Sequence, residues 1–176
     1  YDYVFCQETR IANPAQVQCS LQAKGWKAVV GTQPPLMRYN KDSSRIGHGG
    51  LMTMTRQGGC FELAIDSDYS ELKHCVQHMY IATAGGRAGV HVFNIYMPSG
   101  AACFKERQNL MRLLLDYAAR LGSVPILILG DLQDEPNNNA EVAAALATGV
   151  WNDAVASFYE ARDEKPPATF TSDQRW

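Results

Sequence analysis

Carboxylate, phenol and amide side chains follow three apolar stretches of this 176-residue sequence. Glu8 comes after the first stretch, Tyr96 ends the second, and Asp131 follows the third, the continuous apolar run 125–129. Hard divalent cations prefer oxygen ligands, and a phenol beside such a cation can donate a hydrogen bond to a phosphate oxygen. The combination indicates a site that binds a divalent cation and acts on a phosphate.

Each of these residues has a simpler explanation when it is taken alone. Glu8 could be a surface carboxylate, Asp131 a turn residue after Gly130, and Tyr96 an ordinary strand residue. Their neighbours favour a site. Gly130 would let a substrate approach the backbone closely, and the Gln133 amide would add a donor and an acceptor two residues after Asp131.

Rigid strands are needed to position these side chains, and the hydrophobic pattern predicts a strand-rich chain. The Gly58-Gly59 turn predicts that 50–55 and 60–65 pair as a hairpin, and the run 125–129 predicts a strand buried on both faces. A Pro- and Arg-containing loop is expected over 32–49. The expected strands are 3–6, 26–30, 50–55, 60–65, 76–82, 90–96 and 125–129, with weaker strand or loop signals at 151–155 and 168–170.

Helices are expected over 14–24, 105–121 and 139–146, the first of them capped by Asn13. Strands outnumber these helices, and the buried strands end in acidic residues. We therefore expect an α/β sandwich of two sheets, with helices outside and a site formed by the loops at one edge. The length allows one domain over residues 1–176.

The composition excludes several classes of protein. A formal net charge of −2 excludes a protein that holds nucleic acid by bulk electrostatics, and no apolar run approaches the ~20 residues of a membrane span. Five cysteines without a Cys-x-x-Cys pair argue against a disulfide framework or a zinc site, and favour a reducing, intracellular compartment. His74 and His78 have i, i+4 spacing, but the strand pattern that follows favours a surface or sheet-edge position over a metal site.

Five segments, taken in order, resemble the motifs of the endonuclease/exonuclease/phosphatase superfamily, which has the pancreatic-deoxyribonuclease-like fold. The resemblance implies a four-layered α/β/β/α sandwich of two mainly antiparallel sheets that hydrolyses phosphodiesters or phosphomonoesters with Mg²⁺ or Mn²⁺. The segments are Gln-Glu-Thr-Arg (7–10), Gly-Gly-Leu-Met-Thr-Met (49–54), Val-Phe-Asn-Ile-Tyr-Met-Pro (92–98), Pro-Ile-Leu-Ile-Leu-Gly-Asp-Leu-Gln-Asp-Glu-Pro (125–136) and Ala-Thr-Phe (168–170).

The resemblance implies roles for four residues. Glu8 matches the metal-binding glutamate of the family, and Tyr96 matches a tyrosine that lies beside the scissile phosphate. Asp131 matches the aspartate that positions the attacking water. Gln133 stands where the family has an asparagine whose amide contacts the phosphate and orients neighbouring carboxylates. We expect Tyr96, Asp131 and Gln133 to be catalytic, and Glu8 and Asp131 to bind the metal.

This sequence also departs from the family pattern. Gln133 keeps the amide of the usual asparagine but lengthens the side chain by about one methylene, and active sites tolerate such displacements poorly. The resemblance places an asparagine-bearing strand before Tyr1 and a Ser-x-x-Asp-His segment after Trp176. The chain is therefore expected to lack its first and last strands and to have weak or no activity alone. No counterpart of the family histidine is expected among His48, His74, His78 and His91.

Three further positions carry weaker expectations. Asp153 resembles a loop aspartate of the family, and a turn or capping role is favoured over a metal role. Thr169-Phe170 resembles a pair that positions the last site loop, or it simply closes the edge of the core. Arg107 could face a phosphate, but Lys105-Glu106-Arg107 is more typical of a solvated helix face.

The leading hypothesis is a divalent-metal-dependent DNA endonuclease in the nucleus or cytoplasm. The chain resembles the endonuclease modules of non-long-terminal-repeat retrotransposons, which implies a covalently linked reverse transcriptase as partner. The alternatives are a catalytically decayed or repurposed binding module of the same fold, and a phosphatase or lipid phosphodiesterase of the superfamily. The absence of a Gly-x-Ser-x-Gly segment argues against an unrelated α/β hydrolase.

Overall fold

The computed structural model describes residues 2–32, 50–56, 58–83 and 89–165. The chain forms two compact units, residues 1–135 and residues 136–176. Both β-sheets and the four residues expected at the site belong to the first unit. Within the described residues, no helix is long and apolar enough to cross a membrane. The expectation of a single domain over residues 1–176 stays a prediction.

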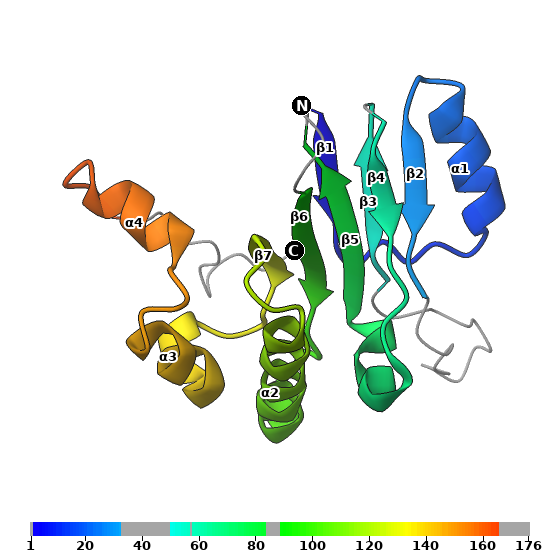
Figure 1. Ribbon diagram of the computed structural model, residues 1–176. Helices are drawn as coiled ribbons and strands as arrows, with labels where there is room; N and C mark the ends of the chain where they lie inside the picture. The colour runs from blue at the N-terminus through cyan, green and yellow to red at the C-terminus, as the bar shows by residue number, and fades with distance from the viewer. Residues whose placement is uncertain (1, 33–49, 57, 84–88, 166–176) are drawn as a thin grey trace. The chain divides into compact units, whose positions relative to one another are not determined.

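The first sheet has three antiparallel strands in the order β1-β3-β2 (Figure 1). They are β1 (Tyr3–Cys6), β2 (Lys27–Val30) and β3 (Met52–Thr55). Helix α1 (Pro14–Gln22) lies beside β2, and its start agrees with the sequence because the Gln16 N–H donates to Asn13 Oδ1 at 3.1 Å. Glu8 therefore lies two residues after the end of β1, at the edge of this sheet's strand ends.

The second sheet has four strands in the order β4-β5-β6-β7. The antiparallel strands are β4 (Cys60–Glu62), β5 (Val76–Ala82) and β6 (Gly89–Tyr96), and β7 (Ile126–Asp131) is parallel to β6. Helix α2 (Phe104–Arg120) makes the crossover that parallel strands require. Short 3₁₀ helices, η1 (Ser67–His74) and η2 (Ala101–Cys103), precede β5 and α2.

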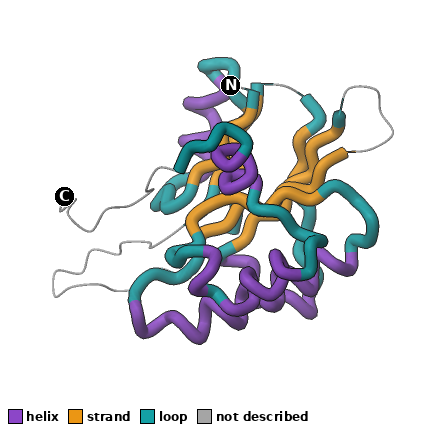
Figure 2. The backbone as a smooth tube through the Cα atoms, turned by 90° about the vertical axis from the view of Figure 1, so that its left-hand side faces the viewer, coloured by secondary structure: helices purple, strands orange, loops and turns teal. Residues whose placement is uncertain are grey.

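The two sheets pack against each other through apolar side chains, and the strands gather side by side in Figure 2. Cys60, Met79 and Val92 of the second sheet are buried against a ring of partly buried residues: Tyr3, Phe5, Val29, Ile81, Val90 and Leu129. Helix α2 covers the opposite face of the second sheet, where Tyr117 contacts the rings of His78 and Phe93. The expected α/β architecture with two sheets is therefore present.

Two predictions about the strands are wrong. Residues 60–62 pair with β5 and not with β3, because β1 and β2 already occupy both edges of β3. Strand β7 is not buried on both faces, and its Leu127 is 42% exposed. In the described part of the chain β7 is the last strand of its sheet, so a continuous apolar run here forms an edge strand.

The described part of the second unit, residues 136–165, contains three short helices. They are η3 (Pro136–Asn138), α3 (Ala140–Ala147) and α4 (Ala154–Glu160). The weak strand or loop signal at 151–155 is confirmed as a loop over 151–153 and is wrong for Ala154 and Val155, because Asp153 accepts hydrogen bonds from the N–H groups of Val155 and Ala156 and so begins α4. Residues 33–49 of the loop expected over 32–49, and the signal at 168–170, lie outside the described residues.

Candidate active site

Tyr96 and Asp131 lie opposite each other at the shared edge of β6 and β7. The parallel register pairs these two residues, and the Met97 N–H donates to the Asp131 carbonyl at 2.9 Å. Gly130 makes this register possible. Its φ is +137°, and a Cβ at this position would lie 2.0 Å from the Ile95 carbonyl oxygen. The Gly-Asp sequence therefore sets the place of the carboxylate.

Gln133 holds both oxygens of the Asp131 carboxylate. Its backbone N–H donates to Asp131 Oδ1 at 2.9 Å, and its side-chain amide donates to Asp131 Oδ2 at 2.5 Å. The backbone of Gln133 is left-handed, with φ +56°, which closes this tight turn. The Gln133 amide, which is longer than that of asparagine, is thus directed at the Asp131 carboxylate.

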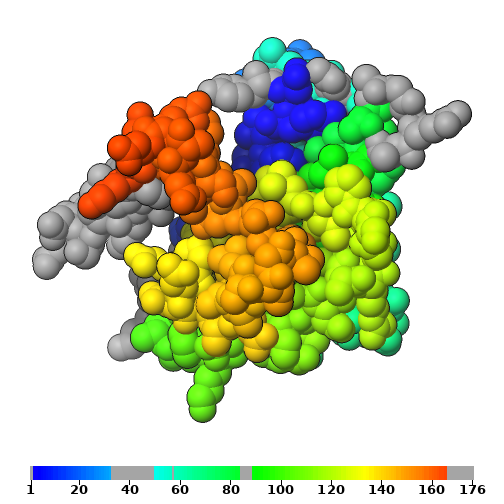
Figure 3. Space-filling model, turned by 60° about the vertical axis from the view of Figure 1, so that its left-hand side comes forward, coloured from blue at the N-terminus to red at the C-terminus, as the bar shows by residue number. Residues whose placement is uncertain are grey.

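Glu8 follows β1 in a strained turn. Glu8 and Arg10 both have left-handed backbones, with φ +51° and +47°, and the Arg10 guanidinium donates to Glu8 Oε1. Between them, the Thr9 N–H donates to the Gly50 carbonyl at 3.1 Å, which ties the turn to the residues before β3. In the space-filling view the N-terminal segment (blue) reaches the surface and borders the yellow-green part of the chain (Figure 3).

Asn94 joins the end of β1 to the second sheet. Its side chain is fully buried, accepts from Gln7 Nε2 at 2.6 Å, and donates to the carbonyls of Cys6 at 3.3 Å and Met52 at 3.4 Å. A buried amide is stable only when its polar atoms are paired, so these bonds fix how the two sheets meet. Asn94 lies two residues before Tyr96, and Gln7 immediately precedes Glu8.

The charges at this edge act on one phenol. Burial raises the pKa of Tyr96, and the negative charges of Glu8 and Asp131 raise it further, while the positive charge of Arg10 opposes them. Tyr96 is therefore protonated at neutral pH and can donate a hydrogen bond. The structure thus brings Glu8, Tyr96 and Asp131 together, with Gln133 attached through Asp131.

The oxygen atoms of the site are of the chemical type that a hard divalent cation prefers. Glu8 and Asp131 supply carboxylate oxygens near the same phenol, and the guanidinium on Glu8 shows that a positive charge is accommodated there. Within the described residues, no group of three or more His, Cys, Asp or Glu side chains could hold a metal ion. A metal-binding role for Glu8 and Asp131 therefore stays a prediction.

Arg107 does not lie on a solvated helix face, as the sequence predicts, but is buried. Its side chain is 7% exposed and donates to the carbonyls of Pro98 at 3.1 Å and Gly100 at 2.8 Å. The signal was present in the sequence, because Arg107 is three residues before Leu110 and seven before Leu114, on the apolar face of the helix.

The surface position expected of His74 is confirmed, because His74 is exposed, whereas the same expectation for His78 is wrong. His74 ends η1, whereas His78 lies in β5 and is buried, so they do not share a helix face. His78 Nδ1 lies 3.1 Å from the Tyr117 hydroxyl, and His78 Nε2 lies 2.9 Å from His91 Nδ1. His78 is thus neither at the surface nor at a sheet edge. His48 and Thr169-Phe170 lie outside the described residues.

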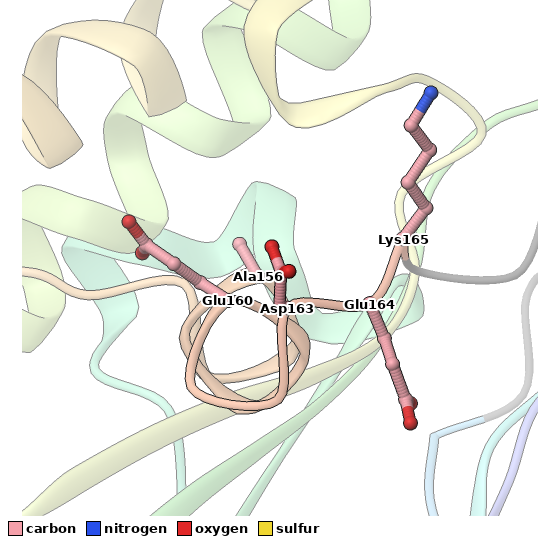
Figure 4. Close-up of a pocket in the computed structure, with 5 residues that line it drawn as sticks. All are labelled: Ala156, Glu160, Asp163, Glu164 and Lys165. Carbon is pink, nitrogen blue, oxygen red and sulfur yellow. The ribbon is translucent and has the colours of Figure 1, made fainter.

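A separate hollow of about 460 Å³ lies on the second unit. It is lined by residues of α4 and the turn after it, Ala156, Glu160, Asp163, Glu164 and Lys165, and their charged side chains splay apart in the close-up (Figure 4). The hollow is wide open, its lining is mostly acidic, and none of the expected site residues contributes to it. It is therefore a surface feature of α4 and not the candidate site.

No protein-family model matches the chain, and a search of the curated proteins finds no significant match. Solved structures do match. An AP endonuclease from Archaeoglobus fulgidus matches with a TM-score of 0.66 at 14% identity, over 99% of this chain and 69% of that one. The chain has the fold of the endonuclease/exonuclease/phosphatase superfamily. The resemblance expected from the sequence is thus confirmed at the level of the fold.

Two further structures match at similarly low identity. The human Nocturnin catalytic domain with a bound sulfate anion has a TM-score of 0.61 at 16% identity, over 94% of this chain and 64% of that one. A truncated TDP2 from Caenorhabditis elegans has a TM-score of 0.51 at 16% identity, over 76% of this chain and 50% of that one. The chain thus spans between half and about two thirds of the length of these structures.

Proposed function

We propose that this chain carries the active site of a divalent-metal-dependent phosphodiesterase. The observation that supports the proposal is the meeting of Glu8, Tyr96 and Asp131 at one edge of a two-sheet sandwich. Two carboxylates beside a protonated phenol combine cation ligands with a hydrogen-bond donor, as hydrolysis of a phosphate ester requires.

The described contacts assign a task to each side chain. Glu8 and Asp131 would hold Mg²⁺ or Mn²⁺, which when bound offsets negative charge on the phosphoryl oxygens. The Tyr96 hydroxyl donates a hydrogen bond to a phosphate oxygen. Asp131 accepts a hydrogen bond from the attacking water and orients it, and Gln133 keeps the Asp131 carboxylate in place through its two hydrogen bonds.

The narrower proposal is an endonuclease that cleaves DNA. The similarity to an AP endonuclease fold supports it, as does a domain of the same fold that binds sulfate, an anion with the shape of phosphate. A net charge of −2 means that contacts at the site must select the nucleic acid. A role beside a covalently linked reverse transcriptase, as in retrotransposons, rests on the motif resemblance alone, and so does the four-layered arrangement of the complete domain.

A second candidate is a non-catalytic binding module of the same fold. Arg10 supports it, because its guanidinium already neutralises Glu8. If Arg10 takes the place of the metal ion at Glu8, the site could bind a phosphate without cleaving it. A phosphatase or lipid phosphodiesterase would share the metal chemistry and differ in substrate.

Nicking of supercoiled plasmid DNA by the protein that contains this chain tests the proposal. We expect nicking with Mg²⁺, none with a chelator, and a loss of at least about 100-fold in Asp131→Asn, because the water loses its anionic partner. Asp68→Asn, an exposed acid of η1, is the matched control and should keep the wild-type rate.

The outcomes separate the candidates. Full nicking by Asp131→Asn would refute the site assignment. Metal-dependent hydrolysis of phosphoinositides or phosphomonoesters without nicking would identify the lipid phosphodiesterase or phosphatase. DNA binding by the folded protein, with no phosphoester cleaved, would establish the binding module.

A further inference from the structure

Arg107 is a buried cation that contacts residues just after Tyr96 and Asp131. It lies in the first turns of α2 and bonds to the carbonyls of Pro98 and Gly100, in the loop that follows β6. Its Nη2 lies 3.9 Å from Asp134 Oδ2, in the loop that follows β7, and the Asp134 side chain is only 12% exposed. One side chain thus contacts both loops that leave the site.

Backbone pairing does not hold these loops together. The last hydrogen bond between the two strand ends runs from the Met97 N–H to the Asp131 carbonyl. Beyond it, in the part of the chain that the structure describes, no backbone hydrogen bond joins 98–100 to 132–135. The relation between the two loops therefore depends on side chains.

The two buried charges also depend on each other. Among the described residues, Arg107 Nε and Asp134 Oδ2 are buried without a hydrogen-bond partner, and the 3.9 Å ion pair between Arg107 Nη2 and Asp134 Oδ2 brings the two opposite charges together. Removing one member of such a pair leaves an uncompensated charge inside the protein. Lysine cannot replace this arginine, because a single ammonium lacks the planar fork that reaches two carbonyls and a carboxylate at once.

We propose that Arg107 is a positioning residue that keeps Tyr96 and Asp131 in place by tying the loop after β6 to the loop after β7. Pro98 is two residues from Tyr96. Asp134 is adjacent to Gln133, which holds both oxygens of Asp131. Movement of Asp134 is thus transmitted to the carboxylate through Gln133, and movement of Pro98 to the phenol.

The catalytic part of this inference rests on the proposed function, so the test has two arms. The first measures amide hydrogen exchange in two variants. Arg107→Lys removes the planar guanidinium, and Asp134→Asn removes the carboxylate charge. We expect the amides of Met97 and Gln133 to exchange at least about tenfold faster, while those of Met79 and Val92 in the core keep the wild-type rate. Arg112→Lys, on the same helix but exposed, is the control.

The second arm measures metal-dependent phosphodiester cleavage. We expect kcat to fall about 10- to 100-fold in both variants with little change in KM, because the reacting groups are displaced while the substrate-binding surface remains. The double variant should lose little more than either single variant, since both break the same link.

The results distinguish this inference from the proposed function. Faster exchange at Met97 and Gln133 supports the tie between the loops even if the protein cleaves nothing, in which case the proposed function alone fails. Wild-type exchange at both amides in folded Arg107→Lys and Asp134→Asn refutes the tie. Wild-type kcat in an active protein that carries either substitution refutes the positioning role.

Discussion

The ion pair between Arg10 and Glu8 sets the charge balance of the candidate site. Both residues are about half exposed, and both adopt left-handed backbones on either side of Thr9. The buried Thr9 hydroxyl has no hydrogen-bond partner among the residues that the structure describes. Strain of this kind persists where the surrounding structure enforces it and is concentrated at functional sites. The turn therefore keeps a guanidinium at the carboxylate that we expect to bind a cation.

Arg10→Ala should increase the affinity of the protein for Mn²⁺ by roughly two- to fivefold, because an exposed ion pair competes only modestly with a divalent cation. Isothermal titration calorimetry measures the affinity without any need for turnover. Arg56→Ala is a suitable control. Arg56 lies next to the end of β1 that is farther from Glu8, and its guanidinium stacks over the ring of Trp26. Weaker Mn²⁺ binding in Arg10→Ala would mean that Arg10 orients Glu8 for the cation and does not compete with it.

At the scale of elements, the strands that carry the site could be predicted from the sequence. The runs ending before Glu8, at Tyr96 and before Asp131 form β1, β6 and β7 where expected, because apolar patterning and Gly-Asp punctuation are local signals. Strand partners could not be predicted in the same way. Residues 60–62 follow a glycine turn, yet pair with β5, because the edges of β3 were already taken by strands distant in sequence.

The partners of buried polar residues could not be predicted from the sequence either. Arg107 and His78 have partners far from them in sequence, such as Asp134 and Tyr117, and no local pattern announces such partners. Arg10 was missed at the site for a related reason, because its contact with Glu8 depends on two left-handed residues in a non-glycine turn. Sequence patterns indicate which residues are apolar, but not which polar groups are paired inside.

Gly130→Ala should separate β6 from β7 at the site. The new methyl group would lie 2.0 Å from the Ile95 carbonyl oxygen at a φ that L side chains rarely adopt, and we expect a loss of about 2–4 kcal/mol in the free energy of unfolding. Gly122→Ala is the matched control. It also has a positive φ but meets nothing within 4 Å, so its cost should be about 1 kcal/mol. Urea unfolding compares the two, and equal losses would contradict the close approach of β6.

At the scale of the whole molecule, one hydrogen-bonded cluster joins α2 to the second sheet. His78 is buried between Tyr117 of α2 and His91 of β6. Burial, with a smaller contribution from His91, lowers the pKa of His78 to about 4. Burial also lowers the pKa of His91. The layers therefore pack around neutral imidazoles.

The free energy of unfolding should consequently fall as the pH drops from about 6.5 toward 4. In this range the unfolded chain binds a proton at His78 that the folded chain does not bind, so protonation favours unfolding. The full effect is about 3 kcal/mol, and it is absent above pH 6.5. Urea unfolding across this range measures the slope. His78→Gln should flatten it, His74→Gln should leave it unchanged, and a wild-type slope in His78→Gln would contradict the assignment.

The pairing of Tyr96 with Asp131 also determines when the site can exist during folding. Its groups come from the end of β1, the end of β6 and the end of β7, which join only by contacts distant in sequence. Pairings of this kind form late in folding, because the entropy cost of closing a long loop comes before the contacts that stabilise the pairing. A partly folded chain that has made only its local helices and hairpins has no site, so any activity would report that the last long-range pairing is complete.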